Sequence, residues 1–182
     1  MSGTSADGID AAVVEFGDNG AMSLAATCQH PLDTALKATI NALCTPGDNE
    51  IDRLGYLDRR LGHAFAEATH VLLANAGLVP GQITAIGSHG QTVRHRPDGT
   101  AGDRISAFTL QLGDPNTIAE LTGISTVTDF RRRDIAAGGE GAPLVPAFHQ
   151  DRFASQGVRR AIVNIGGIAN ATLLEGKTLV GG

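Results

Sequence analysis

The clearest pattern of apolar and polar positions lies between residues 48 and 77. Apolar side chains recur there at intervals of three or four residues: Ile51, Leu54, Leu57, Leu61, Phe65, Ala68 and Leu72. This spacing places them on one face of an α-helix. Asp48 or Asn49 can cap the start of that helix, and Gly77 is suited to its end. The pattern therefore predicts one long amphipathic helix.

Short β-branched or alanine-rich runs near both ends of the chain predict two β-hairpins. The segment IDAAVVEF (9–16) reads as a strand, GDNG as a tight turn and MSLAATCQH as the partner strand. Near the other end, RAIVNIGG and NATLLEG read as a second pair of strands around a glycine turn. Both regions combine a glycine turn with a short strand. Two such regions could each offer backbone N–H groups to one side of a polyphosphate, as the two lobes of a phosphate-binding site would.

The segments between the hairpins alternate between helical and extended patterns. Residues 33–44 predict a short helix that ends before Thr45-Pro46-Gly47. The runs ITAIGSHG, TLQLGD and ISTVTDF predict strands, and Asp114 with Pro115 predicts the start of a helix that stops at Gly123. Residues 130–146 read as a loop, and PAFHQDRFASQG as a helix. This order favours an α/β domain with a mixed sheet and helices.

Composition excludes several classes of protein. The net charge is −5, and the densest basic run, Arg131 to Arg133, lies between Asp129 and Asp134. A nucleic-acid surface normally spreads basic residues over a whole face, so no nucleic-acid partner is expected. Two cysteines cannot build a disulfide framework, and no apolar stretch has the roughly 20 residues of a membrane helix. Acidic residues and glycines replace the features of a signal peptide, so the expected location is cytoplasmic.

Glycines gather at turns rather than in a low-complexity tract. The 24 glycines include clusters near residues 3–8, 87–90, 138–141 and 166–167. Glycine serves where the backbone needs positive φ or must come close to a ligand. Four such clusters predict a ligand cleft built from loops, although ordinary tight turns explain any single cluster equally well.

The first ten residues, MSGTSADGID, carry the first candidate chemistry. The chain holds no Walker motif, no GxGxxG after a strand and no HExxH, so the usual nucleotide and zinc motifs are excluded. SGTSADG instead places hydroxyls, backbone amides and a carboxylate on one turn. Such a turn can bind phosphate oxygens, and Asp7 can hold Mg²⁺ through water. For Asp10, at the start of the strand, a structural hydrogen bond is at least as good an explanation.

The second candidate is TDFRRRDIAAGGEGAP. Asp129 and Asp134 enclose three arginines, and a glycine loop follows. A neighbouring arginine lowers the pKa of a carboxyl group, which keeps it ionised and able to accept a proton. Arginine also suits anion recognition. The alternative interpretation is a solvated loop with routine ion pairs.

At this point the sequence resembles a known family. MSGTSADGID, GSHGQTVRHRP, TLQLGDPNTIAELTGISTVTDFRRRDIAAGGEGAPLVPAFH and NIGGIANATLL match, in order, the anhydro-N-acetylmuramic acid kinases. The resemblance implies an actin-like, ribonuclease H-like ATPase fold, with ATP and Mg²⁺ as cofactors and a homodimer for the full-length protein. It also implies the reaction: the enzyme opens 1,6-anhydro-N-acetylmuramic acid with water and phosphorylates O6, giving N-acetylmuramic acid 6-phosphate for cell-wall recycling.

The same resemblance implies roles for individual residues. Asp134 is the expected general base, and Asp129 is the second choice. The expected sugar-binding residues are His89, Gln91, Asn116, Arg131 and Glu140. The expected ATP-phosphate residues are Gly3, Thr4, Ser5, Ala6, Asp7, Gly8, Ile9, Asp10, Asn164, Gly166 and Gly167.

The resemblance also implies how the chain is divided. Residues 1–158 are expected to form the first lobe of the kinase, and residues 159–182 the start of a truncated second lobe. In the family an apolar strand precedes MSGTS, so the chain is expected to be a fragment that lacks this strand and most of the second lobe. Such a fragment is expected to expose apolar surface, to bind ATP poorly and to be inactive on its own.

Two other functions fit parts of the pattern. A non-catalytic actin-like nucleotide-binding or regulatory module explains the first loop, but it has no need of the DFRRRD and GGEGAP segments. A glycosidase using Asp129 and Asp134 explains the carboxylates, but it leaves the phosphate-type loop without a purpose. Release of ADP separates a kinase from a glycosidase.

Overall fold

The computed structural model describes residues 1–182 except 4–5, 19, 100–101, 166–168 and 182. The chain forms two compact units. Unit 1 consists of Met1–His95 and Leu110–Asp129, and unit 2 of Arg96–Thr109 and Phe130–Gly182. The expected lobe boundary after residue 158 lies inside unit 2, and the division into kinase lobes stays a prediction.

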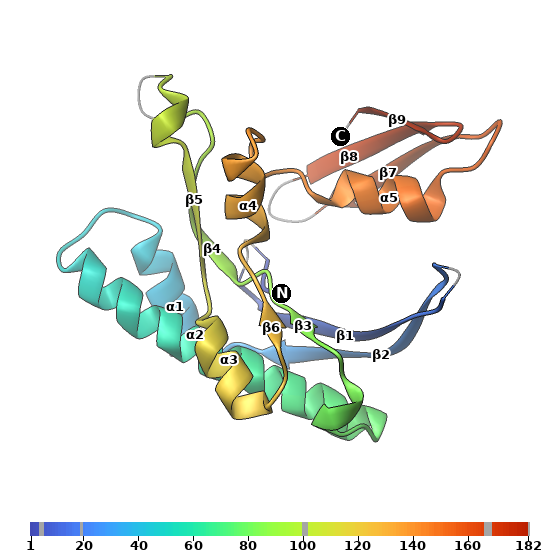
Figure 1. Ribbon diagram of the computed structural model, residues 1–182. Helices are drawn as coiled ribbons and strands as arrows, with labels where there is room; N and C mark the ends of the chain where they lie inside the picture. Colours follow the sequence, from blue (N-terminus) through green and yellow to red (C-terminus); the bar gives the residue numbers. More distant parts are fainter. Residues whose placement is uncertain (4–5, 19, 100–101, 166–168, 182) are drawn as a thin grey trace. The chain divides into compact units, whose positions relative to one another are not determined.

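The chain contains both helices and strands, which gives a mixed α/β structure (Figure 1). In chain order the elements are β1 (Gly8–Phe16), β2 (Met22–Pro31), α1 (Thr34–Leu43), α2 (Glu50–Ala76), the 3₁₀ helix η1 (Pro80–Gln82), β3 (Ile86–Gly87), β4 (Gln91–Arg96), the 3₁₀ helix η2 (Arg104–Ser106), β5 (Phe108–Leu112), α3 (Pro115–Thr122), β6 (Thr126–Val127), α4 (Phe130–Ala136), α5 (Val145–Phe153), β7 (Arg159–Ile165), β8 (Ala169–Glu175) and β9 (Thr178–Gly181).

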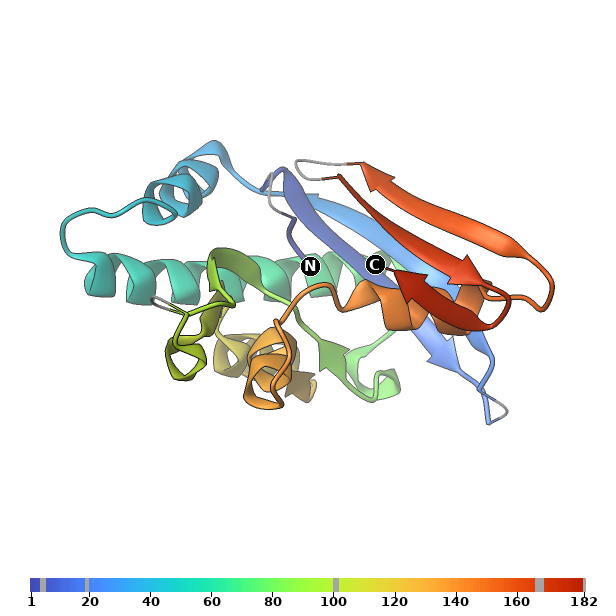
Figure 2. The same cartoon turned by 90° about the horizontal axis from the view of Figure 1, so that it is seen from above.

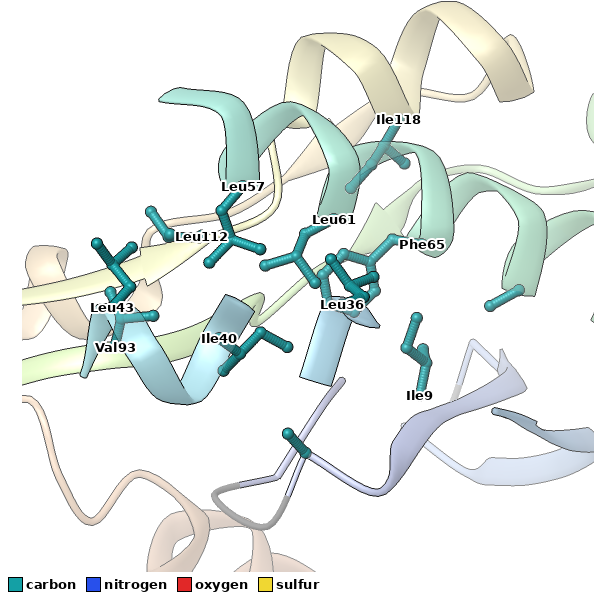
Figure 3. Packing of buried hydrophobic residues seen from close by; sticks show 12 residues of the cluster. Ile9, Leu36, Ile40, Leu43, Leu57, Leu61, Phe65, Val93, Leu112 and Ile118 are labelled. Atoms are coloured by element: carbon teal, nitrogen blue, oxygen red, sulfur yellow. The ribbon is translucent and has the colours of Figure 1, made fainter. Parts of the chain in front are cut away.

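Helix α2 organises the core of unit 1, as its apolar spacing predicts. Leu57 and Leu61 are fully buried, and Phe65 lies one turn further along the same face. Side chains of α1 and α3, among them Ile40 and Ile118, pack against this face (Figure 3). The inclusion of Ile51 in the buried face is wrong: it lies in the first turn of α2 and is 87% exposed.

The ends of two helices follow their sequence signals. Asn49 is the N-cap residue of α2, although its side chain makes no capping hydrogen bond, and Gly77 ends the helix in the left-handed conformation. Asp114 caps α3 through hydrogen bonds from the backbone N–H groups of Asn116 and Thr117. Pro115 occupies the first helical position, and Gly123 ends the helix.

The strands of unit 1 form short pairs rather than one continuous sheet among the described residues. Strands β1 and β2 pair antiparallel, with Ile9 opposite His30 and an irregularity between Val13 and Val14. Strands β3 and β6 pair parallel over only two residues each. Strands β4 and β5, each of which has residues in both units, form a further pair. The expected mixed sheet is therefore present as separate pairs.

Four element assignments need correction or completion. Residues 130–136 were expected in a loop but form α4, whose sequence FRRRDIA is too polar and too short to show an apolar stripe. Strand β4 (QTVRHR) was not predicted because its alternating positions carry arginine and histidine. Strand β9 was also missed. The helix predicted over PAFHQDRFASQG is present as α5, which is shorter at its C-terminal end.

Unit 2 contains the antiparallel sheet β7–β8–β9, with α5 packed on β8 and β9 (Figure 2). His149 Nδ1 of α5 lies 2.8 Å from Thr172 Oγ1 of β8, which ties the helix to the sheet. The sheet leaves large apolar side chains exposed: Val163, Ile165, Leu173 and Val180. Across the described part of the chain, no helix is long and apolar enough to cross a membrane.

Candidate functional site

The loop of residues 3–8 is closed at its base by a short antiparallel ladder. The Met1 ammonium donates to Asp10 O at 2.9 Å, and Asp10 N–H donates to Met1 O at 2.8 Å. Ser2 bridges to Ile9, and Ala6 N–H donates to Gly3 O at 3.0 Å inside the loop. The described residues on both sides of the predicted phosphate turn are thus held by backbone hydrogen bonds. Thr4 and Ser5 lie outside the described residues.

The backbone conformation of this loop is restricted at two residues, Ala6 and Gly8. Ala6 is fully buried and has φ +50, a conformation that non-glycine residues adopt at a cost and that the surrounding structure must hold. A Cβ atom at Gly8 would lie 3.0 Å from His30 O, so the loop passes close to β2 there. The loop backbone is therefore fixed at both places, and preorganised N–H groups are what phosphate binding needs.

The carboxylates of the loop already have protein partners. Asp7 Oδ1 forms a 2.5 Å ion pair with Lys37 Nζ. No sequence motif indicated Lys37 as a residue of the site. Asp10 Oδ1 accepts a hydrogen bond from Gln29 Nε2 at 3.3 Å, which agrees with the structural alternative for Asp10. No group of three or more His, Cys, Asp or Glu side chains that could hold a metal occurs among the residues that the structure describes. A hydrated Mg²⁺ needs only one or two carboxylates, and the exposed Asp7 fits that requirement.

The GSHGQT segment packs tightly against β5. Gly90 has φ +74, and a Cβ atom there would lie 2.6 Å from Leu112 O. Gln91 is 2% exposed; its Nε2 donates to Thr92 O, while its Oε1 accepts no hydrogen bond from the described residues. His89 is half-buried, with Nδ1 2.9 Å from Gly90 O. Of the two expected sugar-binding residues in this segment, His89 is therefore more accessible than Gln91.

Asp114 is the main hydrogen-bond acceptor of the GDPN turn. Its carboxylate accepts from the backbone N–H groups of Asn116 and Thr117, from Asn116 Nδ2 at 3.0 Å and from Thr117 Oγ1. Burial by itself would raise the pKa of Asp114, but the hydrogen bonds from Thr117 and Asn116 outweigh it and lower this pKa to about 2. Asn116 is exposed and its side chain is held by Asp114, so a ligand can approach the amide oxygen.

A third carboxylate, Asp58 of α2, was not predicted from the sequence. Its Oδ1 accepts from Gly113 N–H at 2.7 Å. Burial raises the pKa of Asp58, the hydrogen bond from Gly113 lowers it, and the charges of Asp114 and Asp129 raise it further. The only sequence feature that could have indicated Asp58 is its position directly after Leu57, on the apolar face of the predicted helix. Asp129 itself is exposed and has φ +63.

In unit 2, α4 and the GGEG turn are joined by hydrogen bonds. Gly141 N–H donates to Asp134 Oδ2 at 2.8 Å, and Arg131 Nη1 donates to Gly141 O at 2.6 Å. A Cβ atom at Gly139 would collide with the Asp134 carboxylate. Burial lowers the pKa of Arg131. Residues 130–136 of this segment form a helix rather than a loop, and Arg131 and Asp134 hold the turn that follows it.

The remaining predicted residues lie on the surface of unit 2. Glu140 is exposed at the tip of the GGEG turn. Asn164 is exposed near the end of β7 and lies opposite Asn170 of β8. Gly166 and Gly167 lie outside the described residues.

The expected site residues are shared between the two units. Unit 1 carries the first loop with Asp7 and Asp10, together with His89, Gln91, Asn116 and Asp129. Unit 2 carries Arg131, Asp134, Glu140 and Asn164. Each unit thus carries at least one carboxylate of the expected set.

Comparison with known proteins gives one consistent family. The family model described as anhydro-N-acetylmuramic acid kinase matches residues 1–182. The chain is 57% identical over 178 residues to a protein of that name from Shewanella halifaxensis, covering 98% of this chain and 47% of the relative. It is 53% identical over 182 residues to one from Saccharophagus degradans, covering 100% of this chain and 48% of the relative.

These matches also define how much of the relatives is represented. The chain spans about half the length of the curated relatives that it matches. Within that span the matches run over nearly all of the 182 residues, including both glycine turns and the RRRD segment. The chain belongs to the anhydro-N-acetylmuramic acid kinase family.

Proposed function

We propose that this chain provides the phosphate-binding loop and sugar-binding segments of an ATP-dependent kinase acting on 1,6-anhydro-N-acetylmuramic acid. Water attacks the anomeric carbon C1, and the bond between C1 and O6 breaks. A carboxylate takes the proton from the water, and O6 receives the γ-phosphoryl group of ATP. The products are N-acetylmuramic acid 6-phosphate and ADP.

Family membership is the observation that carries this proposal, and the geometry of the first loop supports it. Phosphoryl transfer depends mainly on positioning and on stabilisation of charge. The ladder between Met1 and Asp10 and the buried turn at Ala6 fix the loop before any ligand binds. Asp7 would hold Mg²⁺ through water, with Lys37 beside it as a cation for phosphate oxygens. Asn164 and the turn after it would bind phosphate from the second unit.

The general base is proposed to be Asp134, with Asp129 as the second candidate. A carboxylate base is the group that addition of water at an acetal carbon requires. Asp134 Oδ2 is engaged by Gly141 N–H, whereas its Oδ1 accepts no hydrogen bond from the described residues and remains able to take a proton. His89, Gln91, Asn116, Arg131 and Glu140 are proposed to line or support the sugar pocket.

The first test is turnover by the full-length protein. Purified enzyme is mixed with ATP, Mg²⁺ and the anhydro-sugar, and ADP release is followed together with the mass of the sugar product. We expect ADP and the phosphorylated, ring-opened sugar in equal amounts. Ring opening without ATP would indicate a glycosidase. Nucleotide binding without any turnover would indicate a regulatory module.

The second test separates proton transfer from turn formation at Asp134. Asp134→Asn in the full-length protein keeps an oxygen that can accept from Gly141 N–H but removes the base. We expect at least a hundredfold loss of kcat, with ATP binding retained. Asp151→Asn, at an exposed position on α5, is the matched control and should leave kcat unchanged. Unchanged turnover in Asp134→Asn assigns the base to another group, and Asp129→Asn is the next variant to measure.

A further inference from the structure

The turn of residues 137–141, which follows α4 in unit 2, packs directly on the side chain of Asp134. Gly139 N–H donates to Asp134 O at 2.9 Å, and Gly141 N–H donates to Asp134 Oδ2 at 2.8 Å. A Cβ atom at Gly139 would collide with the Asp134 carboxylate, so the backbone of the turn lies against that carboxylate. The orientation of the carboxylate therefore depends on the position of the turn.

The carbonyl groups of the same turn accept hydrogen bonds from two arginines. Arg131 Nη1 donates to Gly141 O at 2.6 Å. Arg104 Nη2 donates both to Gly138 O at 3.1 Å and to Gly139 O at 3.2 Å. Arg104 belongs to the other segment of unit 2, residues 96–109, and no sequence motif indicated it. One nitrogen of its guanidinium group thus bridges two successive peptide groups of the turn.

The turn has little conformational preference of its own. Three of its five residues are glycines, and Gly138 adopts φ +93. Glycine has the largest conformational freedom in the unfolded chain and loses the most on folding. Hydrogen bonds from neighbouring side chains are therefore needed to keep the turn in one conformation.

The segment that carries Arg104 is itself held by local contacts. Asp103 caps η2 by accepting from Ile105 N–H at 3.0 Å, and Ser106 Oγ donates to Asp103 O at 2.7 Å. A Cβ atom at Gly99 would collide with Asp103 O, so the chain before η2 packs directly on it. Because the backbone at Arg104 is already ordered, its contact with the turn costs less conformational entropy.

We propose that Arg104 is a positioning residue for Asp134. Its guanidinium holds the backbone of Gly138 and Gly139, and this backbone holds the carboxylate in the orientation that proton transfer from water needs. The inference rests on the proposed role of Asp134 as the general base. A misplacement of about 1 Å at a catalytic group can reduce the rate roughly a hundredfold, so an indirect contact of this kind affects turnover.

The experiment compares three variants of the full-length protein. Arg104→Met keeps a long side chain but removes the donors. Arg104→Lys keeps them, because a single ammonium nitrogen can donate to both carbonyl groups. Arg160→Met is the matched control: Arg160 is also exposed in unit 2, and its Nη1 donates to a backbone carbonyl, Phe153 O, at 2.8 Å.

Steady-state kinetics and amide exchange are measured for all three. We expect Arg104→Met to lower kcat by roughly ten- to a hundredfold, with the KM values for ATP and sugar nearly unchanged. Exchange at the Gly139 and Gly141 amides should become about tenfold faster, since the turn opens more often. Arg104→Lys should restore most of the lost kcat, and Arg160→Met should match the unmodified protein in both measurements.

A double variant tests whether Arg104 acts through Asp134. Adding Arg104→Met to Asp134→Asn should lower kcat no further, because the effects of two residues that act as one unit are not additive. A further loss as large as that of Arg104→Met alone would overturn the proposal.

Other results would also contradict the positioning role. These are unchanged kcat or unchanged amide exchange in Arg104→Met, failure of that variant to fold, and an effect confined to the KM for the sugar, which would indicate direct ligand contact. A loss of kcat in Asp134→Asn without any loss in Arg104→Met would overturn this inference alone. Unchanged turnover in Asp134→Asn would overturn the base assignment together with it.

Discussion

The two units differ in how they bury apolar side chains. In unit 1, α1, α2, α3 and strand residues such as Ile9 and Leu112 share one core, and Leu57 and Leu61 are fully buried. In unit 2, Leu174 is the buried large apolar residue of the described sheet, whereas Val163 and Ile165 are 59% and 82% exposed. Unit 1 is therefore stabilised by packing, and unit 2 by its backbone ladder and local side-chain hydrogen bonds.

The largest expected difference is between truncation of a core leucine and of a sheet leucine. Leu61→Ala should lower the free energy of unfolding of unit 1 by about 2–5 kcal/mol, since a cavity remains in the core. Leu173→Ala in unit 2 removes a side chain that is 47% exposed and should cost less than about 1 kcal/mol. Hydrogen exchange during urea titration reports each unit separately. Equal losses in the two variants would remove the distinction between the units.

Glycine substitutions sharpen the same comparison. Gly90→Ala in unit 1 places a Cβ atom 2.6 Å from Leu112 O and should cost about 2 kcal/mol or more. Gly176→Ala in unit 2 has a similar φ, +60, but open space around the new Cβ, so only the backbone penalty of about 1 kcal/mol applies. Thermal unfolding of both variants measures the difference. A smaller loss for Gly90→Ala would show that the GSHG loop is loosely packed.

Carboxylates should behave differently in the two units. Asp114→Ala removes the N-cap of α3 and should destabilise unit 1 by about 1–2 kcal/mol. Glu175→Ala breaks an ion pair with Arg159 in which both side chains are exposed, and should change stability by less than about 0.5 kcal/mol. Urea denaturation at pH 7 checks both values. A large effect of Glu175→Ala would mean that the surface of unit 2 contributes more than its exposure indicates.

The pH dependence of the Asp114 contribution follows from its pKa of about 2, below the ordinary value of 3.8. A carboxyl group with a lowered pKa in the folded state binds protons more tightly when unfolded. Its stabilisation is therefore complete above about pH 4 and is lost as the pH falls toward 2. In Asp114→Ala this part of the acid-induced loss of stability should disappear. A pH profile identical to that of the unmodified chain would contradict the assignment.

The smallest effect is expected at Asp58, where burial raises the pKa. Protonation favours the folded state at this residue, so its contribution to stability decreases as the pH rises through the ordinary range of a carboxyl group. Asp58→Asn keeps an oxygen that can accept from Gly113 N–H and removes the charge beside Asp114. We expect unchanged or slightly increased stability at pH 7 by urea denaturation. A loss larger than that of Asp114→Ala would show that the Asp58 charge is needed.

The sequence predicted the parts of the fold that depend on local signals. The apolar spacing from Leu54 to Leu72 identified α2, and Asp114, Pro115 and Gly123 marked both ends of α3. Helix α4 was missed because its stability depends on contacts that form only after folding, such as those of Asp134 and Arg131 with Gly141. Strands β3 and β6 have only two residues each, too few for a periodicity of two to define their ends.

For the candidate site, motifs predicted positions in the chain but not the partners of the side chains. MSGTSADGID predicted a loop, and the structure holds it with Met1 and Asp10. The ion pair between Asp7 and Lys37 and the hydrogen bond from Gly113 to Asp58 join residues far apart in the chain, so no local pattern announces them. Residue types near a motif therefore indicate chemistry, while protonation and orientation require the folded structure.

The most direct test of the phosphate-loop assignment is nucleotide binding by the full-length protein, followed at individual backbone amides. A non-hydrolysable ATP analogue with Mg²⁺ is titrated while the signals of Gly3, Asp7 and Gly8 in unit 1 and Asn164 in unit 2 are recorded. We predict saturable shifts and slower hydrogen exchange at these amides, with weaker shifts when Mg²⁺ is omitted. Saturable binding of the analogue that leaves all four amides unchanged would contradict the account.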